Sequence, residues 1–306
     1  QMVLEAAKKY SYMPNEIARS LQKSSTKTIA VVLPDISETF FGTIVKEIDR
    51  VVARQGYLMI LTDTHENIEN EQKYLNMLYT RRVDALVLAT VDTSGRTVSR
   101  YLEQDIPVIF IDNVPEFTDI DAVTIDNRRA SQLAVEYLIS HGHHRIAAIV
   151  GSKTETTGVE RLAGYEAVLK GHQISVDEKL IQFGDYKRES GYLLMKQLLK
   201  QREKHPFTAV YIAAEKMTYG AMTAIEESGL SVPRDLSVLG FDIHEIGMKP
   251  KQKITTIRQP GTEIGRKVGE LLLRRLDTAK RKNASEEYER LFLESFLEEG
   301  ETVGTV

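Results

Sequence analysis

Polar and aromatic side chains stand in the loops and first helical turns that follow several short apolar segments, where they could hold a small ligand. Phe40 and Phe41 follow residues 28–33, and Asp112 follows residues 108–111. Further side chains in such positions are Asn113, Thr157, Arg161, Tyr186, Glu215 and Asp242. Carboxylates, amides and a guanidinium group bind a polar ligand through hydrogen bonds, and one of the Phe rings can stack on a sugar or base. Each residue alone could equally be a solvated loop residue or a helix cap, but the set favours a binding site.

The segments that must position these residues alternate between strand and helix patterns. Residues 28–33 form a run rich in β-branched side chains, and residues 40–54 carry apolar side chains at helical spacing. The further strands that we predict are 57–61, 85–88, 108–111, 122–125, 146–150, 180–183, 209–212, 237–240, 255–257 and 291–297. The further helices that we predict are 69–81, 97–104, 128–141, 161–171, 190–201, 219–228 and 262–280. This alternation predicts parallel sheets with helices on both faces.

The order of these elements predicts an α/β protein with two doubly wound parallel-sheet subdomains and a ligand cleft between them. We assign residues 28–126 and 258–288 to the first subdomain, and residues 127–257 and 289–306 to the second. Parallel sheets bind ligands at the carboxyl ends of their strands, and the candidate ligand residues all stand there. They can therefore converge in the cleft.

The segment that precedes the first strand is basic. Up to Ala30 the chain has five Lys or Arg residues and two Glu residues, whereas the whole chain has a net charge of −4. A local excess of positive charge on an otherwise acidic protein is typical of an arm that contacts nucleic acid.

Composition and motifs exclude several other classes. The chain has no cysteine, which rules out disulfides, zinc–thiolate sites and thiol catalysis. No apolar run is long enough to span a bilayer, no signal peptide is apparent, and we expect a cytoplasmic protein without membrane contact. His141, His143 and His144 flank Gly142 without a carboxylate at ligand spacing, so a helix cap is favoured over a metal site. No catalytic motif is present, and we expect neither an enzyme nor a bound cofactor.

A series of motifs, in order, resembles the LacI/GalR family of bacterial transcription repressors. The motifs are residues 12–21 (YMPNEIARSL), 34–36 (PDI), 40–41 (FF), 82–86 (RVDAL), 141–146 (HGHHRI), 161–165 (RLAGY), 184–186 (GDY), 230–242 (LSVPRDLSVLGFD) and 255–260 (TTIRQP). Each motif is weak alone, but their order and spacing match from residue 3 to about residue 297.

The resemblance implies a DNA-binding role for residues 1–27. It implies the end of a helix-turn-helix headpiece, whose recognition helix is missing from this chain, and a hinge helix near 15–22 that enters the minor groove of an operator. Leu21 would be the wedge between base pairs. Asn15, Arg19 and Lys23 would also contact the DNA, the two basic residues mainly at phosphates. A homodimer would pair two hinge helices on a near-palindromic operator. The alternative is an ordinary N-terminal helix whose leucine packs on the core.

The resemblance also implies that the strand-end residues are the effector positions of the family, with Gln259 among them. Paired carboxylates and a guanidinium group with an aromatic floor suit a sugar or sugar derivative. The chain departs from the family at Glu215 and Lys216, where Asn-Asp is frequent, and at Ile243, so the identity of the effector stays open. Lys153, Arg161 and Lys216 suit a phosphorylated or acidic sugar, although Lys153 and Lys216 could equally be solvated.

These observations predict a ligand-responsive repressor that binds operator DNA and a small metabolite. Effector binding would change the orientation of the two lobes and thereby stabilise or release the hinge helices. The main alternative is a sugar-binding protein of a transport system, which has the same two-lobed fold but requires export and no basic hinge.

Overall fold

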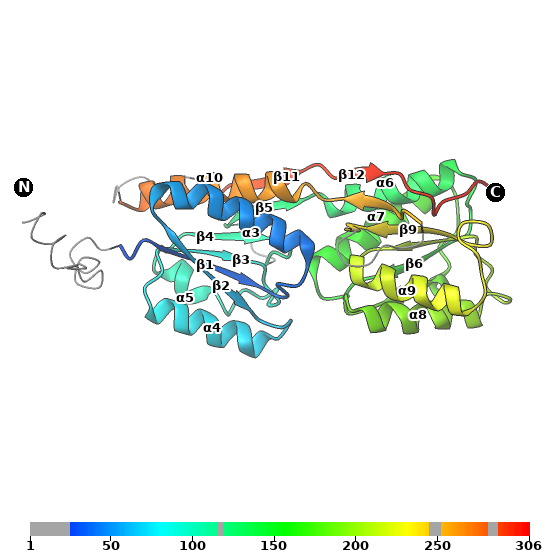
Figure 1. Ribbon diagram of the computed structural model, residues 1–306, viewed down its shortest axis with the longest axis horizontal. Helices are drawn as coiled ribbons and strands as arrows, with labels where there is room; N and C mark the ends of the chain where they lie inside the picture. Colours follow the sequence, from blue (N-terminus) through cyan, green and yellow to red (C-terminus); the bar gives the residue numbers. More distant parts are fainter. Residues whose placement is uncertain (1–24, 116–118, 245–251, 281–286) are drawn as a thin grey trace, which may run out of the picture.

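The computed structural model describes residues 25–115, 119–244, 252–280 and 287–306. Two six-stranded sheets lie side by side along the long axis of the molecule, each covered by helices on both faces (Figure 1). The predicted fold class is therefore confirmed. The predicted hinge helix and its DNA contacts at Asn15, Arg19, Leu21 and Lys23 lie outside the described residues.

The first sheet has the strand order β2-β1-β3-β4-β5-β11, with every neighbouring pair parallel. Its strands are β1 (Thr28–Leu33), β2 (Leu58–Asp63), β3 (Ala85–Leu88), β4 (Val108–Ile111), β5 (Asp121–Ile125) and β11 (Arg290–Leu293). Its helices are α3 (Thr39–Val52), α4 (Ile68–Thr80), α5 (Ser99–Glu103) and α10 (Gly261–Lys280), with the short turn η1 (Ala53–Gln55) after α3. Figure 1 shows α3 and α10 on one face and α4 and α5 on the other.

The second sheet repeats this order as β7-β6-β8-β9-β10-β12, with only β12 antiparallel to its neighbour. Its strands are β6 (Ile146–Val150), β7 (Ile181–Phe183), β8 (Ala209–Ile212), β9 (Ser237–Phe241), β10 (Thr255–Arg258) and β12 (Phe296–Glu298). Its helices are α6 (Asn127–Ser140), α7 (Thr156–Gly171), α8 (Arg188–Lys200) and α9 (Glu215–Glu227), with η2 (Glu178–Leu180) before β7.

Burial on both faces explains why the central strands are apolar without interruption. In β1, Ile29, Val31 and Leu33 pack with α3 and α10, whereas Ala30 and Val32 join the separate core under α4. Successive strand residues point to opposite faces, so both positions of the alternation must be apolar. Some helices that follow a strand begin at a side-chain cap. At the start of α6, for example, Asp126 accepts a hydrogen bond from the Arg129 N–H at 2.7 Å.

The chain passes between the subdomains three times, and the last crossing corrects a predicted boundary. The crossings follow β5, β10 and β11. We predicted one strand over 291–297 and placed residues 289–306 in the second subdomain. Instead, Arg290–Leu293 pairs with β5 in the first sheet, and only Phe296–Glu298 pairs with β10 in the second. Each sheet thereby gains an edge strand from one apolar stretch, which local patterning cannot divide.

Several predicted helices begin at different residues. Helix α7 begins at Thr156 rather than Arg161, so Thr157 lies in its first turn and not in a loop. Helix α9 begins at Glu215, four residues before the predicted start. Both differences move candidate ligand residues onto the amino-terminal turns of helices. Among the described residues, no helix is long and apolar enough to cross a membrane.

Candidate functional site

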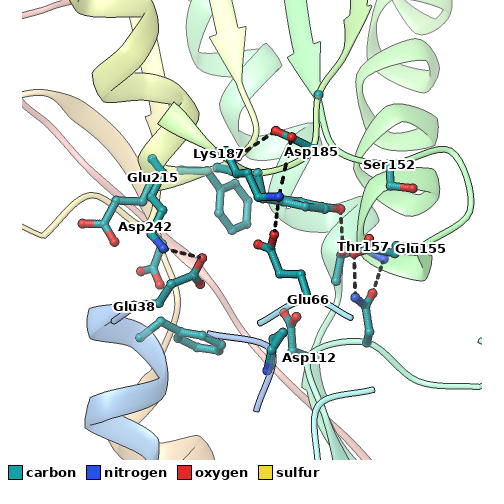
Figure 2. A pocket seen from close by; sticks show the side chains of 18 of the residues that line it. Glu38, Glu66, Asp112, Ser152, Glu155, Thr157, Asp185, Lys187, Glu215 and Asp242 are labelled. Atoms are coloured by element: carbon teal, nitrogen blue, oxygen red, sulfur yellow. Dashed lines mark hydrogen bonds and ion pairs between the residues drawn. The ribbon is translucent and has the colours of Figure 1, made fainter. Parts of the chain in front are cut away.

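A cavity of about 520 Å³ lies between the two subdomains at the carboxyl ends of the parallel strands. All ten residues that we predicted as effector positions line it: Phe40, Phe41, Asp112, Asn113, Thr157, Arg161, Tyr186, Glu215, Asp242 and Gln259. Figure 2 shows side chains from both subdomains directed toward this space. The positions after strands, from which we predicted these residues, therefore meet at one cavity.

The first turn of α3 supplies the aromatic part of the first wall. Phe40 and Phe41 are 6% and 2% exposed, and their ring centroids are 5.2 Å apart. Both rings line the cavity while they also belong to the hydrophobic core. A rigid apolar floor of this kind can pack against the carbon face of a ring-shaped ligand.

The loop after β4 joins the two walls through Asn113. The Asn113 side-chain amide donates to Glu155 Oε2 at 2.8 Å, and its carbonyl oxygen accepts from Thr156 Oγ1 at 3.1 Å and from the Thr157 N–H at 3.2 Å. Asn113 thus caps helix α7 of the opposite subdomain. Its amide makes these contacts within the protein, so its part in the site is to hold the walls together.

Arg161 is fixed deep in the second wall. Its Nε donates to Asn127 Oδ1 at 2.8 Å, one terminal nitrogen donates to the Ala213 carbonyl at 2.8 Å, and its guanidinium carbon lies 3.8 Å from the Phe241 ring centroid. These contacts orient the group before any ligand arrives. Burial raises the pKa of Asp112, while the positive charge of Arg161 acts to lower it.

Tyr186 reaches the cavity because Gly151 leaves room for it. A Cβ at Gly151 would lie 2.1 Å from the Tyr186 ring, so only glycine fits under this side chain. The Tyr186 hydroxyl lies 3.0 Å from Thr157 Oγ1. Burial raises the pKa of Tyr186, which keeps the hydroxyl neutral as a hydrogen-bond donor or acceptor.

Glu215 and Asp242 lie together on the second wall and use backbone donors. Asp242 Oδ1 accepts from the Gln259 N–H at 3.0 Å, and Oδ2 accepts from Gln259 Nε2 at 3.1 Å. Glu215 Oε1 accepts from the His244 N–H at 2.9 Å. Burial raises the pKa of Glu215, and the nearby Asp242 charge acts in the same direction. The pair leaves acceptor oxygens for hydroxyl or ammonium hydrogens of a ligand.

Two lysines of the second wall reach across to acidic groups of the first. Lys216 pairs with Asp35 and donates to Ser37 Oγ at 3.1 Å, and Lys187 Nζ lies 3.1 Å from Glu66 Oε2. Burial opposes ionisation of Asp35, but the hydrogen bond from Lys216 lowers its pKa overall. Lys153 is not among the described residues that line the cavity, and its ammonium group lies 4.1 Å from the Phe183 ring centroid.

Several residues at the strand ends have left-handed backbone angles. Asp112, Tyr186 and Asp242 have φ values of 58°, 64° and 54°, and Glu66 has 56°. Such angles are uncommon for residues with a Cβ and often occur at ligand sites, where the fold holds a side chain in one direction. Their presence on both walls supports a preorganised site.

Five acidic or basic lining residues were not among those predicted from the sequence. They are Glu38, Glu66, Glu155, Asp185 and Lys187. The strand-end rule could have found Glu66, because it follows β2 as Asp112 follows β4. Glu155 and Lys187 stand at helix N-caps, and nothing in their local sequence distinguishes them from solvated caps. In the part of the chain that the structure describes, no group of three His, Asp or Glu side chains could hold a metal ion.

Comparisons with known proteins agree with this geometry. The family described as "Periplasmic binding proteins and sugar binding domain of LacI family" matches residues 26–292. The HTH-type transcriptional repressor PurR of Erwinia tasmaniensis is 34% identical over 286 residues, which cover 93% of this chain and 83% of the relative. The chain belongs to the LacI family of transcriptional repressors.

Two solved structures of this family match nearly the whole chain. A LacI family regulator from Enterococcus faecium with bound ribose has a TM-score of 0.79 at 29% identity, covering 91% of this chain and 99% of that one. The lac repressor dimer bound to operator and an anti-inducer has a TM-score of 0.84 at 25% identity, covering 99% and 89%. Ligand-responsive transcriptional repression is therefore the function of the chain, and the alternative of a transport protein is not supported.

Proposed function

We propose that the cleft is the effector site of this repressor and that the ligand is a sugar or sugar derivative. The observation that carries the proposal is the meeting of Asp112, Arg161 and Asp242 at one cavity beside aromatic rings. Arg161 and Asp242 are only 5% and 4% exposed, and contacts within the protein hold both side chains in fixed directions at the cavity. Adjacent hydroxyl groups of a sugar can form hydrogen bonds with groups held in this way, and ribose occupies the Enterococcus faecium relative.

The proposal extends to DNA. Asn15, Arg19, Leu21 and Lys23 contact a near-palindromic operator, and two copies of the chain form the homodimer that reads it, as the lac repressor dimer does in its complex. The protein acts in the cytoplasm and catalyses no reaction. The effector changes operator affinity through its different fit to two arrangements of the lobes.

The test is operator binding by protein with an intact headpiece, measured by fluorescence anisotropy with and without metabolites. Sugars, sugar phosphates, sugar acids and nucleosides form the panel, and a thermal-shift screen identifies those that bind. We expect one class to change operator affinity, and Asp242→Ala to abolish this response. Asp49→Ala, at an exposed position of α3, is the matched control and keeps it. Operator affinity that no metabolite changes would contradict the proposal.

The hinge proposal has its own test. Leu21→Ala removes the side chain that would enter a base step, so we expect operator binding to weaken by about tenfold or more while effector binding stays unchanged. Arg19→Ala, at a phosphate contact, should instead reduce the salt dependence of binding by about one ion. Equal operator affinities of Leu21→Ala and the parent protein would exclude the wedge.

A further inference from the structure

The lining of the cleft is strongly acidic. Seven carboxylates face three cationic side chains among the described lining residues. The carboxylates are Glu38, Glu66, Asp112, Glu155, Asp185, Glu215 and Asp242, and the cations are Arg161, Lys187 and Lys216. Low-dielectric walls strengthen the field of such an excess inside a cleft. The cavity therefore attracts cations and repels anions.

The three cations are already engaged by the protein itself. Lys187 Nζ lies 3.1 Å from Glu66 Oε2 and 3.9 Å from Asp185 Oδ2. Lys216 is held by Asp35, with Ser37 beside it, and Arg161 is held by Asn127 and the Ala213 carbonyl. A ligand phosphate or carboxylate would have to displace these contacts. A phosphorylated or acidic sugar, which Lys216 and Arg161 suggested in the sequence, is therefore disfavoured.

Glu38 is a carboxyl group with little compensation for its charge. It stands at the N-cap of α3, yet its side chain makes no cap hydrogen bond, and it accepts no hydrogen bond from the residues that the structure describes. Its ion-pair partner is Lys216, whose Nζ lies 3.9 Å away and already serves Asp35. Burial, against the opposing effect of Lys216, raises the pKa of Glu38 to about 8, and the charges of Asp112, Asp35 and Glu215 add to the increase.

Glu38 has no hydrogen-bond donor among the described residues, and it shares the positive charge of Lys216 with Asp35. A protonated amine supplies both, with up to three N–H groups, and it gains from nearby aromatic faces such as Phe40. Hydroxyl groups alone carry no charge that would stabilise the ionised form of Glu38, so beside a neutral sugar this carboxyl stays protonated. Figure 2 shows Glu38, Glu215 and Asp242 at one end of the cavity, with a dashed line from Glu38 to the amine nitrogen of Lys216. An ammonium group of a ligand would lie beside that lysine.

We propose that the effector is a polyhydroxylated amine of the amino-sugar type, whose ammonium group is held by Glu38 and Glu215 while Asp112, Arg161 and Asp242 hold its hydroxyl groups. This inference rests on the proposed effector site and narrows its ligand class. The cleft would select this ligand by its positive charge, so the N-acetylated form, which is neutral, should bind less tightly.

Binding of the amine is coupled to a proton. Without a bound cation the Glu38 carboxyl is mostly protonated at pH 7, because burial raises its pKa to about 8. An ammonium group favours the ionised form, so an amine that arrives protonated displaces the proton of Glu38 into solution when the complex forms. A neutral sugar leaves Glu38 protonated and releases none.

The experiment compares ligands that differ only in charge. Glucosamine, galactosamine and mannosamine are each titrated beside the neutral hexose, the N-acetyl form and the uronic acid, by calorimetry at pH 7 in two buffers of different ionisation enthalpy. We expect at least one amine to bind about tenfold or more tightly than its neutral parent, with proton release. Neutral or acidic forms that bind as tightly as the amine overturn the proposal, as does the absence of binding by all three amines.

Two variants locate the effect. Glu38→Gln keeps the shape and removes the charge, so the preference for the amine should fall to about that of the neutral parent and proton release should vanish. Glu103→Gln makes the same change at an exposed site of the first subdomain and should change neither. An unchanged amine preference in Glu38→Gln overturns the proposal. Proton release by the unmodified protein is an independent readout if that variant fails to fold.

Failure of the amine proposal can be distinguished from failure of the proposed effector site. A neutral or acidic sugar that binds the cleft and changes operator affinity excludes the amine and leaves the effector site established. Operator affinity that responds to no metabolite, amines included, contradicts the effector site itself.

Discussion

The two walls of the cleft carry different charges although they come from subdomains with the same strand order. Among the described lining residues, the first wall has carboxylates at Glu38, Glu66 and Asp112 and no cation, whereas Arg161, Lys187 and Lys216 all belong to the second wall. The repeated topology fixes where side chains enter the cleft, but residue identity fixes their charge. Because the two walls differ in charge, they attract each other through two ion pairs, Lys187 with Glu66 and Lys216 with Asp35.

The largest effect should come from removing the buried cation of the second wall. Arg161→Met keeps the volume but leaves Asp112 and the Ala213 carbonyl without the guanidinium group. Loss of one partner of a buried charged network costs about 2–5 kcal/mol, so effector affinity should fall by about 30-fold or more in a calorimetric titration. Affinity within about twofold of the parent protein would mean that the charge of the second wall plays no part in binding.

A smaller effect should appear in the pH dependence of stability. Glu38 has its pKa raised from an ordinary 4.5 to about 8, so between these values the folded state holds a proton that the unfolded chain releases. The free energy of unfolding therefore falls as pH rises through this window. The full shift corresponds to about 5 kcal/mol, which solvent screening of the 26% exposed side chain reduces to the order of 2 kcal/mol. Thermal unfolding from pH 5 to 8.5 measures it.

Glu38→Gln sharpens this measurement because glutamine cannot ionise. The variant should lose less stability than the parent protein toward pH 8.5, while Glu103→Gln should follow the parent curve. Burial also raises the pKa values of Asp112 and Glu215, so the variant should still lose some stability as the pH rises. Parallel curves for Glu38→Gln and the parent protein would show that the first wall is not destabilised by this charge.

The smallest effects should come from the two lysines that cross the cleft. Lys216 is 28% exposed and Lys187 is 60% exposed, and exposed ion pairs contribute only about 0.2–1 kcal/mol. Lys216→Met should therefore open the lobes more than Lys187→Met does, as measured by the radius of gyration of the ligand-free protein in solution. A larger opening in Lys187→Met would reverse this ranking of the two contacts.

The sequence predicted most of the site because parallel α/β sheets obey a simple positional rule. Side chains directly after strands reach the same edge, so Asp112, Tyr186 and Asp242 could be assigned to one cavity without coordinates. Glu66 obeys the same rule and was overlooked. The starts of α7 and α9 were predicted too late, because the residues before Arg161 and Tyr219 are polar and lack apolar periodicity.

The sequence by itself determined the alternation of strands and helices, the two-lobed architecture and the family, because these depend on local periodicity and on the order of motifs. Only the tertiary structure decided which sheet receives Arg290–Leu293, since an apolar segment pairs with whichever edge strand lies within reach. It also decided that Lys216 and Lys187 are engaged by carboxylates across the cleft while Glu38 lacks a hydrogen-bonding partner. Compensation of charge depends on distances between residues far apart in the chain, and no sequence pattern encodes those distances.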